Sequence, residues 1–146
     1  MSAREAVVVL HAHTELGMTP GRSLWDVLEA KLEEVAPQMD PWEVACTLVS
    51  YAKLGKTPKK SLFAALGRRL EAVAPDFTAD DVAGVLSSFA KLGLHPGEST
   101  LQVLLKRAEE VAPDMDAQAV ASTLHAYAEL ETELADSHAD GALTGQ

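Results

Sequence analysis

A period of 38 residues runs along the chain, and it limits the possible folds more than any other feature. Leu-Gly pairs, single prolines and Ala-Pro pairs each return at this interval. They stand at 16–17, 54–55 and 92–93, at 20, 58 and 96, and at 36–37, 74–75 and 112–113. Residues 40–77 and 78–115 align without a gap and agree at 17 of 38 positions, most of them Val, Ala, Leu, Gly or Pro. A fixed period between about 20 and 50 residues is typical of repeat arrays, in which each unit buries its apolar side against its neighbours.

Each repeat has the pattern of two helices. In the second copy Asp40, Pro41 and Glu43 supply an N-cap, a first-turn proline and a capping-box carboxylate. Gly55 ends this first helix, and Thr57-Pro58 precedes the second. The predicted buried stripes are Val44, Leu48 and Tyr51 on the first helix and Leu62, Leu66, Leu70 and Val73 on the second. In the other copies they are Leu24, Leu28, Leu32 and Val35; Val82, Leu86 and Phe89; and Val120, Leu124 and Tyr127.

The predicted fold is therefore all-α, a right-handed α-solenoid of about three and a half helical hairpins with seven helices. The repeats occupy about 2–39, 40–77, 78–115 and 116–134. Residues 1–134 form the predicted repeat domain, and the acidic segment 135–146 loses periodicity and is predicted to be disordered. Neither end shows a polar capping helix, which solenoids normally need. Exposed ends that dock on other proteins are one explanation, and a longer array is another.

Composition excludes several classes of function. Apolar runs such as Ala6–Leu10 are far shorter than the roughly 20 residues of a membrane span, so no membrane association is expected. The first ten residues resemble the start of a helix, and neither a signal peptide nor a transit peptide is visible. One cysteine, Cys46, excludes an internal disulfide. No nucleophile triad or phosphate loop is found, and His11 and His13 point to different sides of a helix. We expect no enzyme activity, cofactor, metal or small-molecule substrate.

A helical hairpin of 38 residues, with a first helix ending in AKLG and a second following a proline, resembles the octotricopeptide repeats. The segments LVSYAKLGKTP and VLSSFAKLGLHP carry this resemblance, which extends over residues 2 to about 131. It implies an α-solenoid that binds single-stranded RNA in a sequence-guided way in a chloroplast or mitochondrion, during RNA processing, stability or translation. The family's Pro-Pro-Pro-Glu-Trp signature is reduced here to lone prolines, and the RAP domain that often accompanies such repeats is absent from these residues. A protein-interaction scaffold without RNA binding is the alternative function.

The exposed side of the first helices is the predicted RNA surface. Because Val44, Leu48 and Tyr51 face inward, the opposite side of that helix faces outward along the stack. Small and polar residues there change from copy to copy while the core stripe does not, as at the base-reading positions of RNA-binding repeat proteins. Drift of unconstrained surface positions is the alternative explanation. The candidate contacts on this side are Trp42, Ser50, Lys53, Ser87, Ser88, Lys91 and His125.

Trp42 has two interpretations. It is the one large aromatic residue expected on this outward side, where an aromatic ring could stack on a base and contribute about 1–3 kcal/mol. Packing against the neighbouring helix is the more common role of such a tryptophan.

The distribution of charge bears on RNA binding in two ways. The net charge of −10 would repel RNA, because nonspecific affinity comes from basic groups that neutralise phosphates. Residues 44–70 nevertheless contain six basic and no acidic residues. Among the six, Lys53, Lys56 and Lys60 are candidate phosphate contacts, with plain solvated lysines as the alternative. Arg68 and Arg69 lie near a helix C-terminus, where cations are favoured, and are expected to be structural.

Overall fold

The computed structural model describes residues 1–144, and it describes side chains for residues 1–132. Within residues 1–144 it contains seven α-helices and three short 3₁₀ helices. The α-helices are α1 (Ala3–Leu16), α2 (Arg22–Val35), α3 (Pro41–Leu54), α4 (Lys60–Val73), α5 (Ala79–Leu92), α6 (Glu98–Val111) and α7 (Ala117–Thr144). The 3₁₀ helices η1 (Ala36–Gln38), η2 (Ala74–Asp76) and η3 (Ala112–Asp114) contain the Ala-Pro pairs and join one hairpin to the next.

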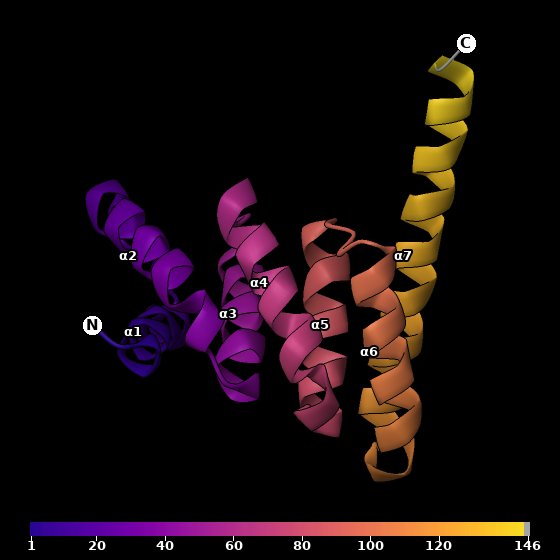
Figure 1. The fold of residues 1–146 in the computed structure, drawn as a ribbon, viewed down its shortest axis with the longest axis horizontal. Coiled ribbons are helices and arrows are strands. Elements are labelled where there is room, and N and C mark those ends of the chain that lie inside the picture. The colour runs from indigo at the N-terminus through magenta and orange to yellow at the C-terminus, as the bar shows by residue number, and fades with distance from the viewer. Residues whose placement is uncertain (145–146) are drawn as a thin grey trace.

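The helices form two parallel rows. Helices α1, α3, α5 and α7 contact one another in that order, and α2, α4 and α6 form the second row beside them. Figure 1 shows the hairpins following one another along the long axis of the molecule, with the N-terminus near one end and α7 at the other. This arrangement confirms the predicted all-helical solenoid of hairpins. Contacts between successive repeats replace the single central core of a globular domain.

Capping residues explain why the first helices begin and end where they do. Ser2, Asp40 and Thr78 each accept a hydrogen bond from the backbone N–H three residues later, and an acidic residue there completes a capping box. At the other end Gly17, Gly55 and Gly93 adopt left-handed backbone conformations with φ between 66° and 68°. Residues with a Cβ rarely adopt this conformation, which explains the glycine in each copy.

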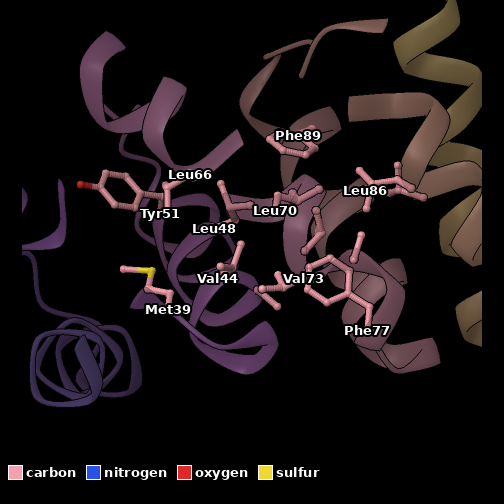
Figure 2. Packing of buried hydrophobic residues seen from close by; sticks show 14 of the residues in the cluster. Met39, Val44, Leu48, Tyr51, Leu66, Leu70, Val73, Phe77, Leu86 and Phe89 are labelled. Carbon is pink, nitrogen blue, oxygen red and sulfur yellow. The ribbon is translucent and has the colours of Figure 1, made fainter. Parts of the chain in front are cut away.

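The core is continuous from one repeat to the next. Leu48 and Tyr51 of α3 and Leu66 and Leu70 of α4 are fully buried, and Phe77 from the connector fills the space before α5. Figure 2 shows Leu48, Leu66 and Leu70 with Tyr51 on one side of them and Phe77 on the other, within one buried cluster. The predicted central stripes are therefore confirmed. Each fully buried leucine or phenylalanine contributes about 1.5–3 kcal/mol of transfer free energy.

Arginines of the second helices connect each hairpin to the one before it. Arg69 Nε donates to the carbonyl oxygen of Met39 at 2.7 Å, and Arg107 Nε donates to that of Phe77 at 2.9 Å. The two bonds are related by the 38-residue period. The structural role expected of Arg69 is therefore confirmed.

Carboxylates from the preceding second helix support the N-termini of α4 and α6, which have no side-chain N-cap of their own. Glu71 accepts hydrogen bonds from the hydroxyls of Ser99 at 2.7 Å and Thr100 at 3.2 Å. One repeat earlier, Glu33 lies 3.2 Å from Lys59 Nζ, and hydrogen bonding to Ser61 lowers the pKa of its carboxyl group. A negative charge near a helix N-terminus is also favoured by the helix dipole.

Both ends of the stack expose positions that are buried in the middle. Leu24 is 47% exposed, and Val120 and Leu124 are 40% and 63% exposed, although all three were predicted to be core. The equivalent residues Leu62, Val82 and Leu86 are fully buried. The prediction fails at the ends because no neighbouring helix of the described chain covers these positions.

Helix α7 is longer than expected. A helix ending near 134 and a disordered segment over 135–146 were predicted, but the helix continues to Thr144. At the repeat positions where Gly93 and Pro96 end a helix and begin the next turn, the fourth copy has Glu131 and Leu134. Both are good helix formers, so the stop signal is lost. Residues 145–146 of the predicted tail lie outside the described residues.

None of the described helices combines the length and the apolar character needed to cross a membrane.

Candidate nucleic-acid interface

A first cleft opens on the outer side of the first-helix row, where α3 lies between α1 and α5. Its volume is about 260 Å³. Helix α3 supplies most of the lining, including Trp42, Cys46, Val49 and Lys53. All four lie on one stripe of the helix, because successive members are three or four residues apart. The remaining lining residues are His11, Thr14, Ala45, Ser50, Asp80 and Asp81.

A second cleft of about 280 Å³ repeats this site between α5 and α7. It is lined by Asp80, Ala83, Gly84, Ser87, Asp116, Gln118, Ala119 and Ser122. First-cleft positions 42, 45, 46, 49, 80 and 81 become 80, 83, 84, 87, 118 and 119 when moved by one repeat, and all six line the second cleft. The hollow is therefore a property of the repeat, while the side chains in it belong to each copy.

The two clefts have different chemistry. The first presents an indole, a thiol and a valine along α3, whereas the second presents a carboxylate, a glycine and a hydroxyl at the same places. The absence of a side chain at Gly84 leaves the backbone of α5 open to the second cleft. One repeated hollow with different linings is the arrangement expected of a surface that contacts one element of an extended ligand per repeat.

Trp42 is held by α1 and still partly exposed. The guanidinium of Arg4 lies 4.5 Å from the centre of the indole ring, and the ring of His11 meets it edge-on with centroids 6.5 Å apart. Arg4 also donates to Asp40 at 2.8 Å and lies 3.3 Å from Glu43. The structure thus shows the packing on a neighbouring helix that was considered for this residue. Because 40% of Trp42 remains exposed, the indole also has surface to offer a ligand.

Cys46 is beside a histidine but is not activated. Its sulfur lies 3.7 Å from His11 Nδ1 and 4.0 Å from Ser50 Oγ, and His11 Nε2 is 3.6 Å from Glu15. Burial raises the pKa of the Cys46 thiol above its ordinary value. A reactive cysteine needs a lowered pKa, so this geometry favours a neutral thiol that lines the cleft.

The predicted phosphate contacts occupy different environments. Lys53 is exposed and lines the first cleft, and Lys91 is exposed at the equivalent place on α5. Lys60 is exposed at the first residue of α4. The Lys56 ammonium lies 5.6 Å from the centre of the Trp25 ring, a cation–π contact that gives this side chain a structural role. Lys53, Lys60 and Lys91 are therefore the lysines best placed for phosphate.

The remaining predicted contacts divide into buried and exposed groups. Ser88 is 3% exposed, and its hydroxyl donates to the Gly84 carbonyl oxygen at 2.7 Å. Ser50 is 1% exposed although it borders the first cleft. Ser87 is half-buried and lines the second cleft. The His125 side chain is 75% exposed on α7, with Nε2 lying 2.7 Å from Glu129.

Two residues that shape this surface, Arg4 and Asp81, were not among the predicted RNA contacts. Arg4 holds Trp42 from the preceding repeat, and Asp81 is both a capping residue of α5 and part of the first cleft. The period offers a signal for Arg4, which lies 38 residues before Trp42. Among the described residues, no group of three or more His, Cys, Asp or Glu side chains is placed to hold a metal ion.

Comparison with known proteins identifies the family of the chain. No curated protein matches the chain. A family model described as RNA-editing substrate-binding complex 6 protein matches residues 1–140. The match supports an RNA-related helical protein, as the octotricopeptide resemblance implied, but it does not extend to the octotricopeptide or RAP assignments themselves. Since the match covers almost the entire sequence, the chain belongs to the RNA-editing substrate-binding complex 6 protein family.

Proposed function

We propose that this protein binds single-stranded RNA along the outer side of α1, α3, α5 and α7, as part of an RNA-processing assembly. The observation that carries the proposal is the cleft repeated at equivalent positions on α3 and α5 with different linings. The family description, which names a complex that binds RNA-editing substrates, supports it from an independent direction. The octotricopeptide resemblance further supports a chloroplast or mitochondrial location.

In this proposal bases lie over the clefts, and phosphates follow the ends of the helices that carry lysine. Lys53 and Lys91 occupy equivalent positions at the C-terminal ends of α3 and α5, and Lys60 begins the helix after the turn. Two carboxylates border each cleft, Asp80 and Asp81 at the first and Asp80 and Asp116 at the second. The first cleft also presents Trp42 and Lys53, whereas the lining of the second contains neither an aromatic residue nor a lysine. The first cleft is therefore the main contact, where indole stacking on a base contributes about 1–3 kcal/mol.

A fluorescence-anisotropy titration with a pool of random single-stranded RNA tests this function. Three phosphate contacts give a slope of log affinity against log salt of about −2 for a single strand, or a loss of about 20-fold between 50 and 200 mM salt. Replacing two of the three lysines, Lys53→Glu with Lys60→Glu, should remove most of the binding and flatten the slope.

The matched control has the same change of charge elsewhere on the protein. Arg68→Glu with Lys106→Glu alters two exposed residues at equivalent positions of α4 and α6, about two turns beyond the N-terminal end of each helix and away from the turn that carries Lys60. It should keep most of the affinity. Equal losses in the two double variants would show that binding follows net charge and that the proposed face is wrong.

A protein-interaction scaffold is the second candidate function. The exposed apolar residues at both ends of the stack, such as Val27 at 66% and Leu124 at 63%, favour it. A chain that binds no RNA at low salt and forms a protein complex insensitive to salt would support the scaffold over RNA binding.

A further inference from the structure

The groove between α6 and α7 is the interior of a repeat that no helix of the described residues covers. Its volume is about 370 Å³, and its lining is mostly apolar: Leu105, Ala108, Glu109, Ala112, Met115, Val120, Thr123, Leu124 and Tyr127. One repeat earlier the equivalents of Val120, Leu124 and Tyr127 are Val82, Leu86 and Phe89, none more than 2% exposed. Helix α6 packs against that earlier core, through Leu101 and Leu104. The groove could therefore accommodate one more helix, placed as α6 is placed one repeat earlier.

The polar groups beside the groove repeat a pattern whose partners are known from the previous repeats. Glu109 is the equivalent of Glu33 and Glu71, which pair with Ser61 and Ser99 at the start of the next second helix. Among the described residues, Glu109 has no partner of this kind.

The backbone of the connector repeats a second polar contact. The Met39 and Phe77 carbonyl oxygens accept from Arg69 and Arg107, and Met115 is the next position in that series. Within the described part of the chain, no arginine donates to the Met115 carbonyl. Because arginine donates to this carbonyl in both earlier repeats, and a charged donor contributes more than a neutral one, an arginine of an incoming helix would fit this position.

These two internal examples define the chemistry of the missing helix. Both α4 and α6 carry serine, leucine, arginine and valine at the same spacing, Ser-x4-Leu-x2-Arg-x3-Val. The residues are Ser61, Leu66, Arg69 and Val73 in α4, and Ser99, Leu104, Arg107 and Val111 in α6. Residues 131–146 contain no arginine or lysine, so they cannot complete the series.

We propose that the groove between α6 and α7 binds an amphipathic helix of a partner protein that carries this pattern. Its leucine and valine cover Val120 and Leu124, its serine donates to Glu109, and its arginine donates to the Met115 carbonyl. A second copy of the chain fits less well, because its α2 has Lys31 at the arginine position of the pattern, and that lysine lies 3.4 Å from Glu34 of the same helix. The inference does not depend on RNA binding.

A helix from the protein itself is the probe. A fluorescent peptide of residues 57–77, stapled between positions 64 and 68, presents the required pattern as a preformed helix. Ala64 and Arg68 are exposed, so the staple lies away from the contacting stripe. The peptide is titrated with the intact chain by fluorescence anisotropy, alongside a peptide in which Leu66→Asp destroys the apolar stripe and one in which Arg69→Glu reverses the charge.

The expected result is saturable binding that Leu66→Asp abolishes and Arg69→Glu weakens. In the protein, Leu124→Lys should weaken binding at least about tenfold, because it places a charge in the apolar groove between α6 and α7. Leu124 is largely exposed, so this change should leave the fold intact. Val27→Lys at the other end of the stack is the matched control and should not alter binding, since Val27 is equally exposed.

Three outcomes would overturn the inference. The first is no binding of the stapled peptide at concentrations up to about 1 mM, which corresponds to only about −4 kcal/mol. The second is an affinity that Leu124→Lys leaves unchanged or that Val27→Lys reduces as much. The third is self-association of the chain, seen by sedimentation and abolished by Leu124→Lys, which would make a second copy the occupant.

Discussion

The second repeat, residues 40–77, and the third, residues 78–115, build the same hairpin but differ in two separate ways. In the interior one difference is a compensating pair. The hydroxyl of buried Tyr51 donates to Glu29 at 2.8 Å, and burial, together with this hydrogen bond, raises the pKa of Tyr51 above its ordinary value. One repeat later these two positions hold Phe89 and Gly67, so the hydroxyl and its acceptor are lost together.

The aromatic packing in the same place is kept. Trp25 meets Tyr51 edge-on with ring centroids 5.2 Å apart, and Phe63 meets Phe89 edge-on at 5.8 Å. A buried polar group must have a partner, which explains why positions 29 and 51 change together in the next repeat.

On the exposed side of the first helices the two repeats differ without compensation. Trp42, Cys46 and Val49 become Asp80, Gly84 and Ser87, although both sets line the same kind of cleft. Packing therefore does not determine the side chains at these positions. The comparison teaches that the repeat separates residues that hold the stack together from residues that are available for a ligand.

The largest expected effect tests whether the two interiors are equally needed. Leu66 and Leu104 are fully buried at equivalent positions, so Leu66→Ala and Leu104→Ala should each lower the free energy of unfolding by about 2–5 kcal/mol. Urea denaturation followed by far-UV circular dichroism measures both. If either variant left the free energy of unfolding unchanged, the two repeat interiors would not contribute equally to stability.

A smaller effect tests the compensating pair. Tyr51→Phe leaves Glu29 buried with only the Lys59 backbone N–H at 3.3 Å, and it should cost about 1–3 kcal/mol. Phe89→Tyr places a hydroxyl beside Gly67, where that residue offers no side-chain acceptor, and should also destabilise. Both costs are read as shifts of the urea midpoint.

The double variant Tyr51→Phe with Glu29→Leu removes donor and acceptor together. It should be more stable than Tyr51→Phe alone, because no buried polar group is then left without its partner. Leucine is chosen because Leu105 occupies the equivalent position in α6. A double variant less stable than both single variants would show that the pair does not act as a unit.

The next prediction concerns the exposed difference. Trp42→Ala should weaken binding of single-stranded RNA by about 1–3 kcal/mol, or roughly 5- to 150-fold, through lost stacking. Asp80→Ala, at the equivalent position, should not weaken it, because removing a carboxylate lessens repulsion of phosphate. Anisotropy titrations under the same salt conditions compare the two. Equal losses would remove the distinction between the clefts.

The smallest effect is expected at Gly84. A methyl group there gains up to about 1 kcal/mol of helix propensity, but a Cβ would lie only 3.3 Å from Val49 Cγ2. We expect Gly84→Ala to change the free energy of unfolding by less than about 0.5 kcal/mol, since the crowding offsets the gain. A large change in either direction, measured by thermal melting, would show that the contact between α3 and α5 is tighter or looser than described.

Much of the fold was predictable because the repeat supplies several copies of each signal. The capping residues, the helix-ending glycines and the stripe at Leu48 and Tyr51 are local patterns, and the period shows that they recur. The exposed side of α3 followed from the same stripe by elimination, which is why Trp42 and Lys53 were placed correctly on one surface.

The missed features depend on contacts between repeats, which a sequence pattern does not contain. Glu29 of the first repeat is paired with Tyr51 of the second, 22 residues away, and Lys56 of the second repeat contacts Trp25 of the first. The exposure of Val120 and Leu124 depends on the absence of a covering helix in the described chain. The continuation of α7 was the exception, since Glu131 in place of glycine was visible in the repeat alignment.

Photocrosslinking tests the central claim most directly, because it reports which row of helices touches RNA. Random single-stranded RNA carrying 4-thiouridine would be crosslinked to the intact chain, and the modified peptides identified by mass spectrometry. We predict that the adducts concentrate on the first-helix row, around Trp42 and Cys46 of α3 and Ser87 of α5. Adducts confined to α2, α4 and α6, or an even distribution that Lys53→Glu with Lys60→Glu does not change, would contradict the account.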